Sequence, residues 1–287
     1  EKKPHFTLVG KEWDFEEKVY LFGVVNVTPD SFYDGGRFFD RKKAIEHALQ
    51  LEAEGADVVD VGGESTRPGS DPVPEKEEIK RVIPVIEGIR KHSTIPISID
   101  TRKALVAREA LLAGANMVNN VSGTQMQEKM VQVLAENQTP VVVGHIRGTP
   151  KTMQKKPKYS HLLWEIFQEL EKSVEMLKKA GVKNILVDPG IGFGKTPMHN
   201  VIIVRNLGYF SSISHPIMVG VSRKSFIGYF GGGEKPAERL EGSLASSVVA
   251  VMGGAHVLRV HDVQATRKAL NVLHSCLLYT SPSPRDR

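Results

Sequence analysis

Eight short apolar runs recur along the chain, with segments of helical spacing between them. This alternation is typical of parallel strands joined by helices, because a parallel crossover needs a connection of helix length. The runs are apolar and β-branched almost throughout, as expected for strands buried on both faces. They are LFGVVNVT (21–28), DVVDVGG (57–63), IPISID (95–100), NMVNNVSG (116–123), PVVVGHIR (140–147), NILVDPG (184–190), PIMVGVSR (216–223) and HVLRVHD (256–262).

The number of repeats predicts the fold class, α/β, and within it a (β/α)8 TIM barrel. Helical spacing is clearest at 41–55, 76–92, 102–114, 161–181 and 239–254, and several of these segments close with glycine. An open doubly wound sheet is the alternative. That fold usually has a glycine-rich dinucleotide turn after its first strand, and NVTPDSF (26–32) is not such a turn.

The two ends of the chain differ from this pattern. HFTLVGKEWDF (5–15) alternates loosely and predicts a short hairpin across the barrel floor. We expect one domain over residues 1–276. The closing LLYTSPSPRDR (277–287) is polar, proline-rich and aperiodic, which predicts a disordered tail. It resembles translated adapter sequence, in which case the tail is non-native and the last helix is truncated.

Composition narrows the class of protein. The chain is 40% hydrophobic and 25% charged, without an apolar run of about 18 residues, so we expect no membrane span, and the absence of a secretory signal predicts a cytoplasmic address. The single cysteine, Cys276, suits a reducing compartment and is interpreted as buried packing or a stray thiol. The net charge of +5 is dispersed. The lysine-rich KTMQKKPK (151–158) is therefore interpreted as a solvated helix entry rather than a nucleic-acid patch, and mild basicity favours an anionic small molecule.

The segment LVDPGIGFGKT (186–196) looks like a phosphate-binding P-loop but fails by spacing. The motif needs glycine five positions before Gly194, and Pro189 stands there without an N–H group. The glycines are instead interpreted as a thin floor that lets a ring lie close to backbone, with Phe193 beside it. An ordinary glycine-rich turn remains the alternative.

Polar side chains stand at the carboxyl end of every predicted strand, which in such a barrel is the active face. Any single one has an alternative role as a helix cap or rim hydrogen bond, but convergence at all eight strands predicts a site. They are Asn26, Thr28, Glu64, Ser65, Thr66, Arg67, Asp100, Arg102, Asn119, Asn120, His145, Arg147, Asp188, Arg223, Lys224, Arg259, His261 and Asp262.

Two groups within this set have distinct chemistry. Arg259 and His261 alternate on one strand and can clamp an anion, with Asn26 beside them when the barrel closes. Carboxylates, an amide and an ammonium converge from strands three, four, six and seven, and suit a flat ring rich in N–H groups. These are Asp100, Asn119, Asp188 and Lys224.

Six motifs, in order over roughly residues 4–275, resemble those of the dihydropteroate synthases, a family of pterin-binding barrel enzymes of folate biosynthesis and a sulfonamide target. They are GVVNVTPDSFYDGG (23–36), DVGGESTRPG (60–69), ISIDT (97–101), DPGIGFGK (188–195), VGVSRKSFIG (219–228) and LRVHDV (258–263). The resemblance implies condensation of 6-hydroxymethyl-7,8-dihydropterin diphosphate with 4-aminobenzoate to 7,8-dihydropteroate and diphosphate, in a homodimer.

The resemblance also implies roles for individual residues. Pterin binding falls to Asp100, Asn119, Asp188, Phe193 and Lys224, and diphosphate binding to Asn26, Arg259 and His261, with Mg²⁺ bound at Asn26. Aminobenzoate binding falls to Phe32, Thr66, Arg67, Pro68 and Ser225. The expected catalytic residues are Asp34, Asp100, Lys224, Arg259 and His261, of which Asp34 and Asp100 would stabilise a cation-like (SN1-type) transfer.

The chain departs from the family pattern in two places. It has GHIRGTP (144–150) where MHMRGTP is expected, so Gly144 and Ile146 predict a roomier pocket wall. It has Asn119–Asn120 where Asn–Asp is usual, which predicts one carboxylate fewer near the pocket. Two alternatives keep the barrel: a methyltransferase acting between methyltetrahydrofolate and a corrinoid protein, and a pterin-binding homologue without catalysis.

Overall fold

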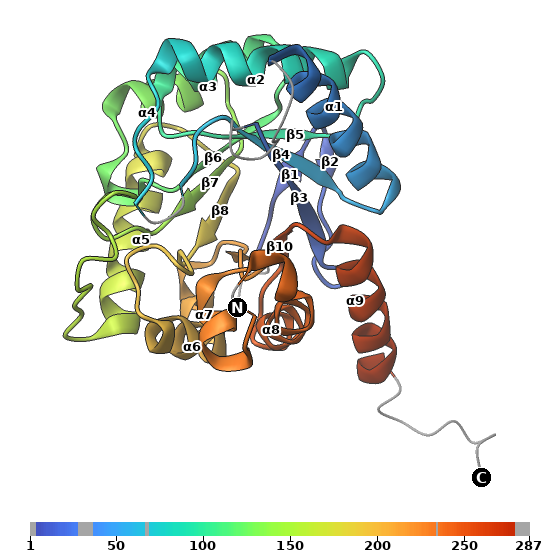
Figure 1. Ribbon diagram of the computed structural model, residues 1–287. Coiled ribbons are helices and arrows are strands. Elements are labelled where there is room, and N and C mark those ends of the chain that lie inside the picture. The colour runs from blue at the N-terminus through green and yellow to red at the C-terminus, as the bar shows by residue number, and fades with distance from the viewer. Residues whose placement is uncertain (1–3, 28–36, 67–68, 234, 279–287) are drawn as a thin grey trace.

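Eight parallel strands form a barrel that helices surround (Figure 1). The computed structural model describes residues 4–27, 37–66, 69–233 and 235–278. The strands lie in the order β8-β7-β6-β5-β4-β3-β10-β9, and each pairs in parallel with its neighbours. They are β3 (Tyr20–Asn26), β4 (Val58–Gly62), β5 (Ile97–Asp100), β6 (Met117–Asn120), β7 (Val141–Gly144), β8 (Ile185–Asp188), β9 (Met218–Val219) and β10 (Val257–Val260).

The ring closes through its shortest strand. β9 has two residues and reaches β8 by one parallel bridge, between Val187 and Ile217. The predicted run 216–223 is longer, because Pro216 has no N–H for the ladder and the chain turns at Arg223, where φ is +57°. All eight predicted strands and the TIM-barrel fold class are confirmed.

The helices cover the outside of the barrel. The five segments with the clearest helical spacing form α1 (Arg37–Ala53), α2 (Glu75–Arg90), α3 (Ala104–Leu112), α5 (Leu162–Lys179) and α8 (Leu240–Met252). The others are α4 (Glu128–Glu136), α6 (Pro197–Arg205), α7 (Ser225–Gly231) and α9 (Val263–Leu278), with 3-10 turns η2 (Gly123–Gln125), η3 (Leu207–Ile213) and η4 (Pro236–Glu238). The lysine-rich segment 151–158 is a turn region that precedes α5.

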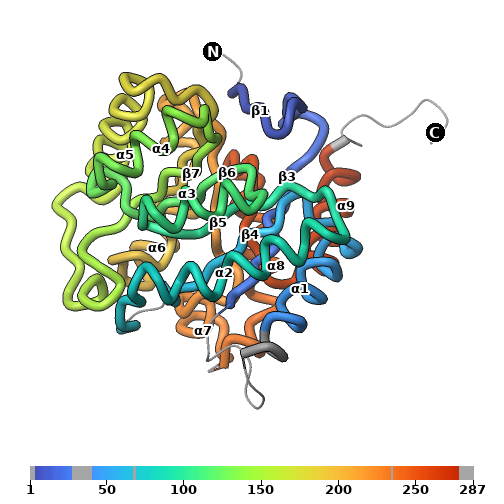
Figure 2. Tube along the Cα trace, turned by 90° about the horizontal axis from the view of Figure 1, so that it is seen from above, coloured from blue at the N-terminus to red at the C-terminus, as the bar shows by residue number. Residues whose placement is uncertain are grey.

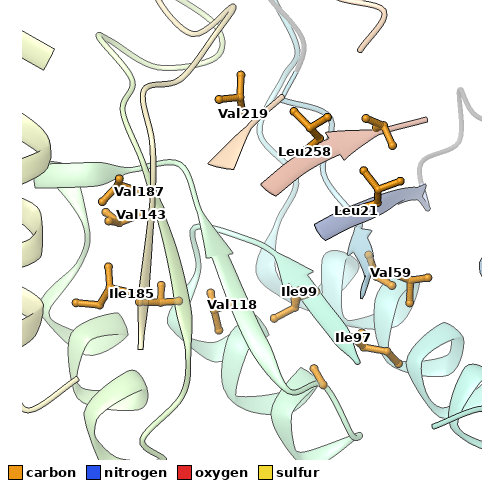
Figure 3. Close-up of a cluster of buried hydrophobic side chains, with 14 of the residues drawn as sticks. Leu21, Val59, Ile97, Ile99, Val118, Val143, Ile185, Val187, Val219 and Leu258 are labelled. Carbon is orange, nitrogen blue, oxygen red and sulfur yellow. The ribbon is translucent and has the colours of Figure 1, made fainter. Parts of the chain in front are cut away.

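Side-chain alternation along each strand divides the interior into two cores. One set points outward and packs under the helices, as Figure 3 shows for Leu21, Ile99, Val118, Val187 and Leu258. The other set points into the barrel. At the amino ends of the strands its members are apolar, and they are Phe22, Val58, Met117, Val142, Leu186, Met218 and Val257.

The amino-terminal hairpin closes the barrel floor, as the sequence predicts. β1 (Thr7–Leu8) and β2 (Lys11–Glu12) are antiparallel, and Phe6, Leu8 and Trp13 pack against the inward-facing apolar layer. The Trp13 ring also stacks on Tyr20, with centroids 4.0 Å apart. β1 and α7 lie on opposite sides of the strands (Figure 2), so the hairpin is remote from the carboxyl ends.

The carboxyl-terminal region bears on two further predictions. α9 continues to Leu278, two residues beyond the predicted domain boundary, and residues 279–287 of the predicted tail lie outside the described part of the chain. Cys276 is exposed on α9, which fits a stray thiol rather than buried packing. Across the described ranges, no helix has the length and apolarity required to cross a membrane.

Replacing Phe6 by alanine tests the hairpin's contribution to stability. Phe6 is fully buried and its ring centroid lies 4.9 Å from that of Trp13. We expect Phe6→Ala to lower the free energy of unfolding by about 3–5 kcal/mol, because it leaves a cavity under the barrel. Urea unfolding measures the change, with the exposed Lys11→Ala as the control in the same hairpin. Equal stability of the two variants would contradict a packed floor.

Candidate active site

A cavity that is open to solvent lies at the carboxyl ends of the strands. Seven residues predicted from the sequence line it, contributed by loops or strands all around the barrel: Thr66, Asp100, Asn119, Asp188, Phe193, Lys224 and Arg259. The rest of the wall is small or apolar and comprises Val121, Gly144, Ile191 and Gly220. The predicted convergence is therefore confirmed in part, because no residue of β3 belongs to this lining and other predicted residues, such as His145, lie outside it.

Arg259 occupies the centre of the polar layer below this cavity. Its Nε donates to Asp60 Oδ2 at 2.6 Å and its Nη2 donates to Asp100 Oδ2 at 2.9 Å. Asp60 Oδ2 also accepts from Asn119 Nδ2 at 3.1 Å. Arg259, predicted for the anion site, therefore connects directly to the residues predicted for the ring.

Sequence reasoning missed Asp60, which is fully buried. A signal was present: Asp60 is the one charged residue inside the apolar strand Val58–Gly62, and it lies in phase with the inward-facing Val58. A charge at such a position needs a buried partner. Arg259 and Asn119 are the partners.

Burial and neighbouring charges shift the pKa values of the cavity groups. Burial raises the pKa of Asp100 to about 7 against the opposing pull of Arg259, and it also raises the pKa of Asp188. Burial lowers the pKa of Lys224 to about 8, aided by Arg259 and opposed by Asp188. For Arg259 burial disfavours the charge, but Asp60 and Asp100 outweigh it and raise the pKa. Such perturbed pKa values are typical of functional sites.

Lys224 is positioned by a tight turn after β9. Arg223 adopts a left-handed conformation, and its guanidinium binds both carboxylate oxygens of Asp262, at 3.0 and 2.5 Å. Its backbone N–H donates to Ser243 Oγ. The strained turn is thus secured from two directions, and it places Lys224 Nζ 4.4 Å from the centre of the Phe193 ring.

His261 adjoins the cavity without lining its wall. Its Nδ1 lies 3.0 Å from Ser222 Oγ, which fixes the ring at the end of β10. Burial, aided by Arg259 and Arg223, lowers the pKa of His261 to about 3. The imidazole is therefore neutral near pH 7, and Nε2 is the nitrogen left for a ligand.

The glycine-rich segment after β8 forms part of the cavity wall. Asp188 Oδ1 accepts the Gly190 N–H at 2.7 Å, and Ile191 and Phe193 line the cavity. Gly190 has a φ of +73°, and a side chain there would collide with the His145 carbonyl, at 1.8 Å from Cβ. Glycine is therefore required by packing against the backbone of His145, which both the predicted floor beside a ring and an ordinary glycine-rich turn allow.

The other predicted residues have varied positions. Asn26 ends β3, next to β10 as predicted, and Ser225 begins α7. Neither residue lines the cavity wall. Phe32, Asp34, Arg67 and Pro68 lie outside the described residues.

The two departures from the family pattern have different outcomes. Gly144 lines the cavity, and a Cβ there would lie 3.2 Å from Val121 Cα, so the predicted roomier wall stays a prediction. Ile146 does not line it but packs with Val121 and Met153 in a small apolar cluster. Asn120 is buried outside the cavity and accepts the Ser122 N–H, because neighbouring residues of β6 point to opposite sides. Neither Ile146 nor Asn120 lines the cavity, and Ile146 supports it only through Val121, so their expected effects on the pocket stay predictions.

Metal binding has limited support from side chains alone. Within the part of the chain that the structure describes, no three His, Cys, Asp or Glu side chains form a group that could hold an ion. Asn26 offers one amide oxygen.

Comparison with known proteins identifies the class. The profile of the family described as pterin binding enzyme matches residues 22–261. The chain belongs to this family. Its relatives narrow the assignment further.

A dihydropteroate synthase of Synechocystis is 43% identical over 262 residues, which are 91% of each chain. Among solved structures, a Xanthomonas albilineans dihydropteroate synthase with 4-aminobenzoic acid superposes with a TM-score of 0.89 at 38% identity, covering 98% of this chain and 100% of that one. A Yersinia pestis dihydropteroate synthase in complex with a sulfonamide drug has a TM-score of 0.89 at 36% identity, covering 96% and 99%. Within the family the chain groups with the dihydropteroate synthases, which are transferases of folate biosynthesis.

Replacing Gly190 by alanine tests how closely the glycine-rich loop packs against the His145 carbonyl, which follows β7. A matched control is Gly181→Ala, since Gly181 has a φ of +91° and a Cβ added there would meet no atom within 4 Å. The control should cost about 1–2 kcal/mol from the left-handed backbone alone. Gly190→Ala should lower the free energy of unfolding by clearly more, because the Cβ also meets backbone. Equal losses in urea unfolding would show that the loop moves freely.

Proposed function

We propose that the chain condenses 6-hydroxymethyl-7,8-dihydropterin diphosphate with 4-aminobenzoate, releasing diphosphate and forming 7,8-dihydropteroate. The proposal depends on one observation: Arg259 connects the predicted ring-binding residues to the predicted anion-binding residues. Its guanidinium donates to Asp100 of the first group and lies near His261 of the second. A pterin methylene group placed there would meet cationic and hydrogen-bond donors on its leaving-group side.

The cavity suits the polar edge of a pterin. Asp188 would accept two N–H groups of that edge, and Asp100 would accept another when ionised. Asn119 donates its amide to Asp60, which leaves its Oδ1 for the ring. Phe193 and Lys224 would complete the enclosure, and Gly144 belongs to the same lining.

The anion end of the site would bind the diphosphate. Arg259 lines the cavity and is held at its Nε by Asp60 and at its Nη2 by Asp100, while His261 presents Nε2. Mg²⁺ would be held by the Asn26 amide oxygen together with phosphate oxygens and water, and would neutralise charge on the leaving group. The hard oxygen donor of Asn26, on the strand beside Arg259, fits this ion.

The proposed chemistry is a cation-like transfer. The bond between the methylene carbon and the diphosphate oxygen breaks, and its electron pair leaves with diphosphate toward Arg259 and His261. Asp100, with Asp34 from outside the described residues, would stabilise the resulting cation. The aminobenzoate nitrogen then supplies the electron pair of the new C–N bond and releases one proton to solvent.

Aminobenzoate would enter from the loops. Thr66 lines the cavity mouth, and Ser225 starts α7, where backbone N–H groups favour a carboxylate. Phe32, Arg67 and Pro68 are proposed to enclose the same substrate. A methyltransferase or a non-catalytic homologue is less well supported, because Arg259 and His261 are retained and the similar proteins are dihydropteroate synthases. The cytoplasmic address stays a prediction.

An activity assay tests the proposal directly. Incubation with dihydropterin diphosphate, 4-aminobenzoate and Mg²⁺ should yield diphosphate and dihydropteroate in equal amounts. Arg259→Lys keeps a counter-charge for Asp60 but loses the forked guanidinium, so turnover should fall at least about 100-fold, by more than the affinity for free pterin falls. The exposed Arg205→Lys is the control. A folded wild-type chain that forms no product would sink the assignment.

We also propose that the chain forms a homodimer through α6 and α8, which pack side by side. Their outer faces expose Met198, Ile202, Val249 and Met252, the last to 66%. Such an apolar surface suits a second copy of the chain. Sedimentation of the wild type should give a dimer, and Val249→Lys with Met252→Lys should give a monomer. Val272→Lys on α9 is the control, and a monomeric wild type would contradict the proposal.

A further inference from the structure

Lys195, the lysine of the near-miss P-loop, is buried inside the protein. It is 2% exposed, and its Nζ lies 2.9 Å from His145 Nδ1 and donates to the Phe193 carbonyl at 3.0 Å. A lysine in such a place costs free energy unless partners compensate for lost water. It is not among the residues that line the cavity, so we looked for its role in the groups that it contacts.

The partner His145 connects Lys195 to the helical layer. His145 is 2% exposed, and burial lowers its pKa to about 4, so the ring is neutral and Nδ1 can accept from Lys195. Its Nε2 lies 3.0 Å from Glu169 Oε2 of α5, at an angle poor for a hydrogen bond. Glu169 also accepts from Arg147 at 2.7 Å. His145 therefore links Lys195 to Glu169 of α5.

Above Lys195 lies the glycine-rich wall of the cavity. A Cβ at Gly190 would lie 3.3 Å from Lys195 Nζ, and the Gly190 N–H donates to Asp188. The other contact, with the Phe193 carbonyl, lies at the far side of the same loop. Lys195 therefore stands behind both Asp188 and Phe193, two residues that line the cavity.

Burial and neighbouring charges shift the pKa values of both Lys195 and Asp188. Lys195 faces Asp188 and Glu169, which favour its charge, and Arg147 and Lys224, which disfavour it; burial dominates and lowers its pKa to about 7. Burial raises the pKa of Asp188, while the Gly190 N–H, Lys224, Lys195 and Arg259 lower it. A positive Lys195 therefore favours the Asp188 carboxylate.

We propose that Lys195 is a positioning residue for the pterin half of the cavity, holding the Phe193 backbone and placing a positive charge behind Asp188 without touching substrate. This inference deepens the proposed function and rests on it. It assigns a role to Lys195, although the segment around it only resembles a phosphate-binding loop. In this proposal the segment contributes to binding of the pterin ring and not of the diphosphate.

Separate binding of the two halves of the substrate tests the inference. Lys195→Met should weaken binding of 6-hydroxymethylpterin about tenfold or more, since a hydrogen bond to a charged group contributes about that much. Inorganic diphosphate, bound at the other end of the cavity, should keep its affinity within about twofold. The control is Lys183→Met, an exposed lysine that precedes β8 at the opposite end of the barrel. Calorimetry measures both ligands.

The pH dependence of pterin binding separates positioning from general stability. Binding needs the Asp188 carboxylate, so affinity falls as pH falls through the pKa of that group. Removing the Lys195 charge raises this pKa, and the acid limb of Lys195→Met should therefore move to higher pH. A residue that only supports the fold would leave the limb in place.

A second variant covers the case in which Lys195→Met does not fold. His145→Gln removes the Nδ1 acceptor but keeps an amide toward Glu169, and it should weaken pterin binding in the same direction. The two substitutions together should be less than additive, because they break one contact. Unchanged pterin affinity, or equal loss of pterin and diphosphate, would overturn the inference. A wild-type chain that binds diphosphate but no pterin would contradict the proposed function itself.

Discussion

The buried guanidinium of Arg259 is the interaction on which the arrangement of the cavity depends. It reaches from β10 to Asp60 on β4 and Asp100 on β5, and Asp60 in turn accepts the Asn119 amide of β6. Charges removed from water are tolerated only when they are paired and hydrogen-bonded. These four strands must therefore keep their register, and the upper half of the barrel interior is polar while the lower half is packed with apolar side chains.

This polar layer gives the cavity its mixed character. Carboxylates and cations share one partly buried space, so each shifts the pKa of the others and none is fully neutralised. Such a space accepts a neutral ring with donors and acceptors at one end and an anion at the other. The glycine-rich loop packs its backbone against the His145 carbonyl, and Lys195 donates to the Phe193 carbonyl of the same loop.

Much of this was predictable, and the failures have physical causes. Strand alternation predicted the barrel, and polar strand ends predicted seven residues of the cavity wall. Asp60 was missed because it lies within an apolar run rather than at a strand end. Ile146 and Asn120 were expected near the pocket from the resemblance alone, and Asn120 lies outside the cavity because adjacent residues of a strand face opposite sides. Lys195 was set aside because no local pattern distinguishes a buried lysine from an exposed one.

The sequence alone predicted the repeat of strand and helix, the closing hairpin, the glycine-rich loop after β8 and the family motifs. Each of these depends on spacing within a few residues. The sequence did not predict which side chains pair across the barrel. The choice of Asp60 for Arg259, of His145 for Lys195 and of Ser222 for His261 joins residues 39 to 199 positions apart. Such pairs form only when the closed barrel brings separate strand ends together and removes them from water, so tertiary structure decided which charges meet.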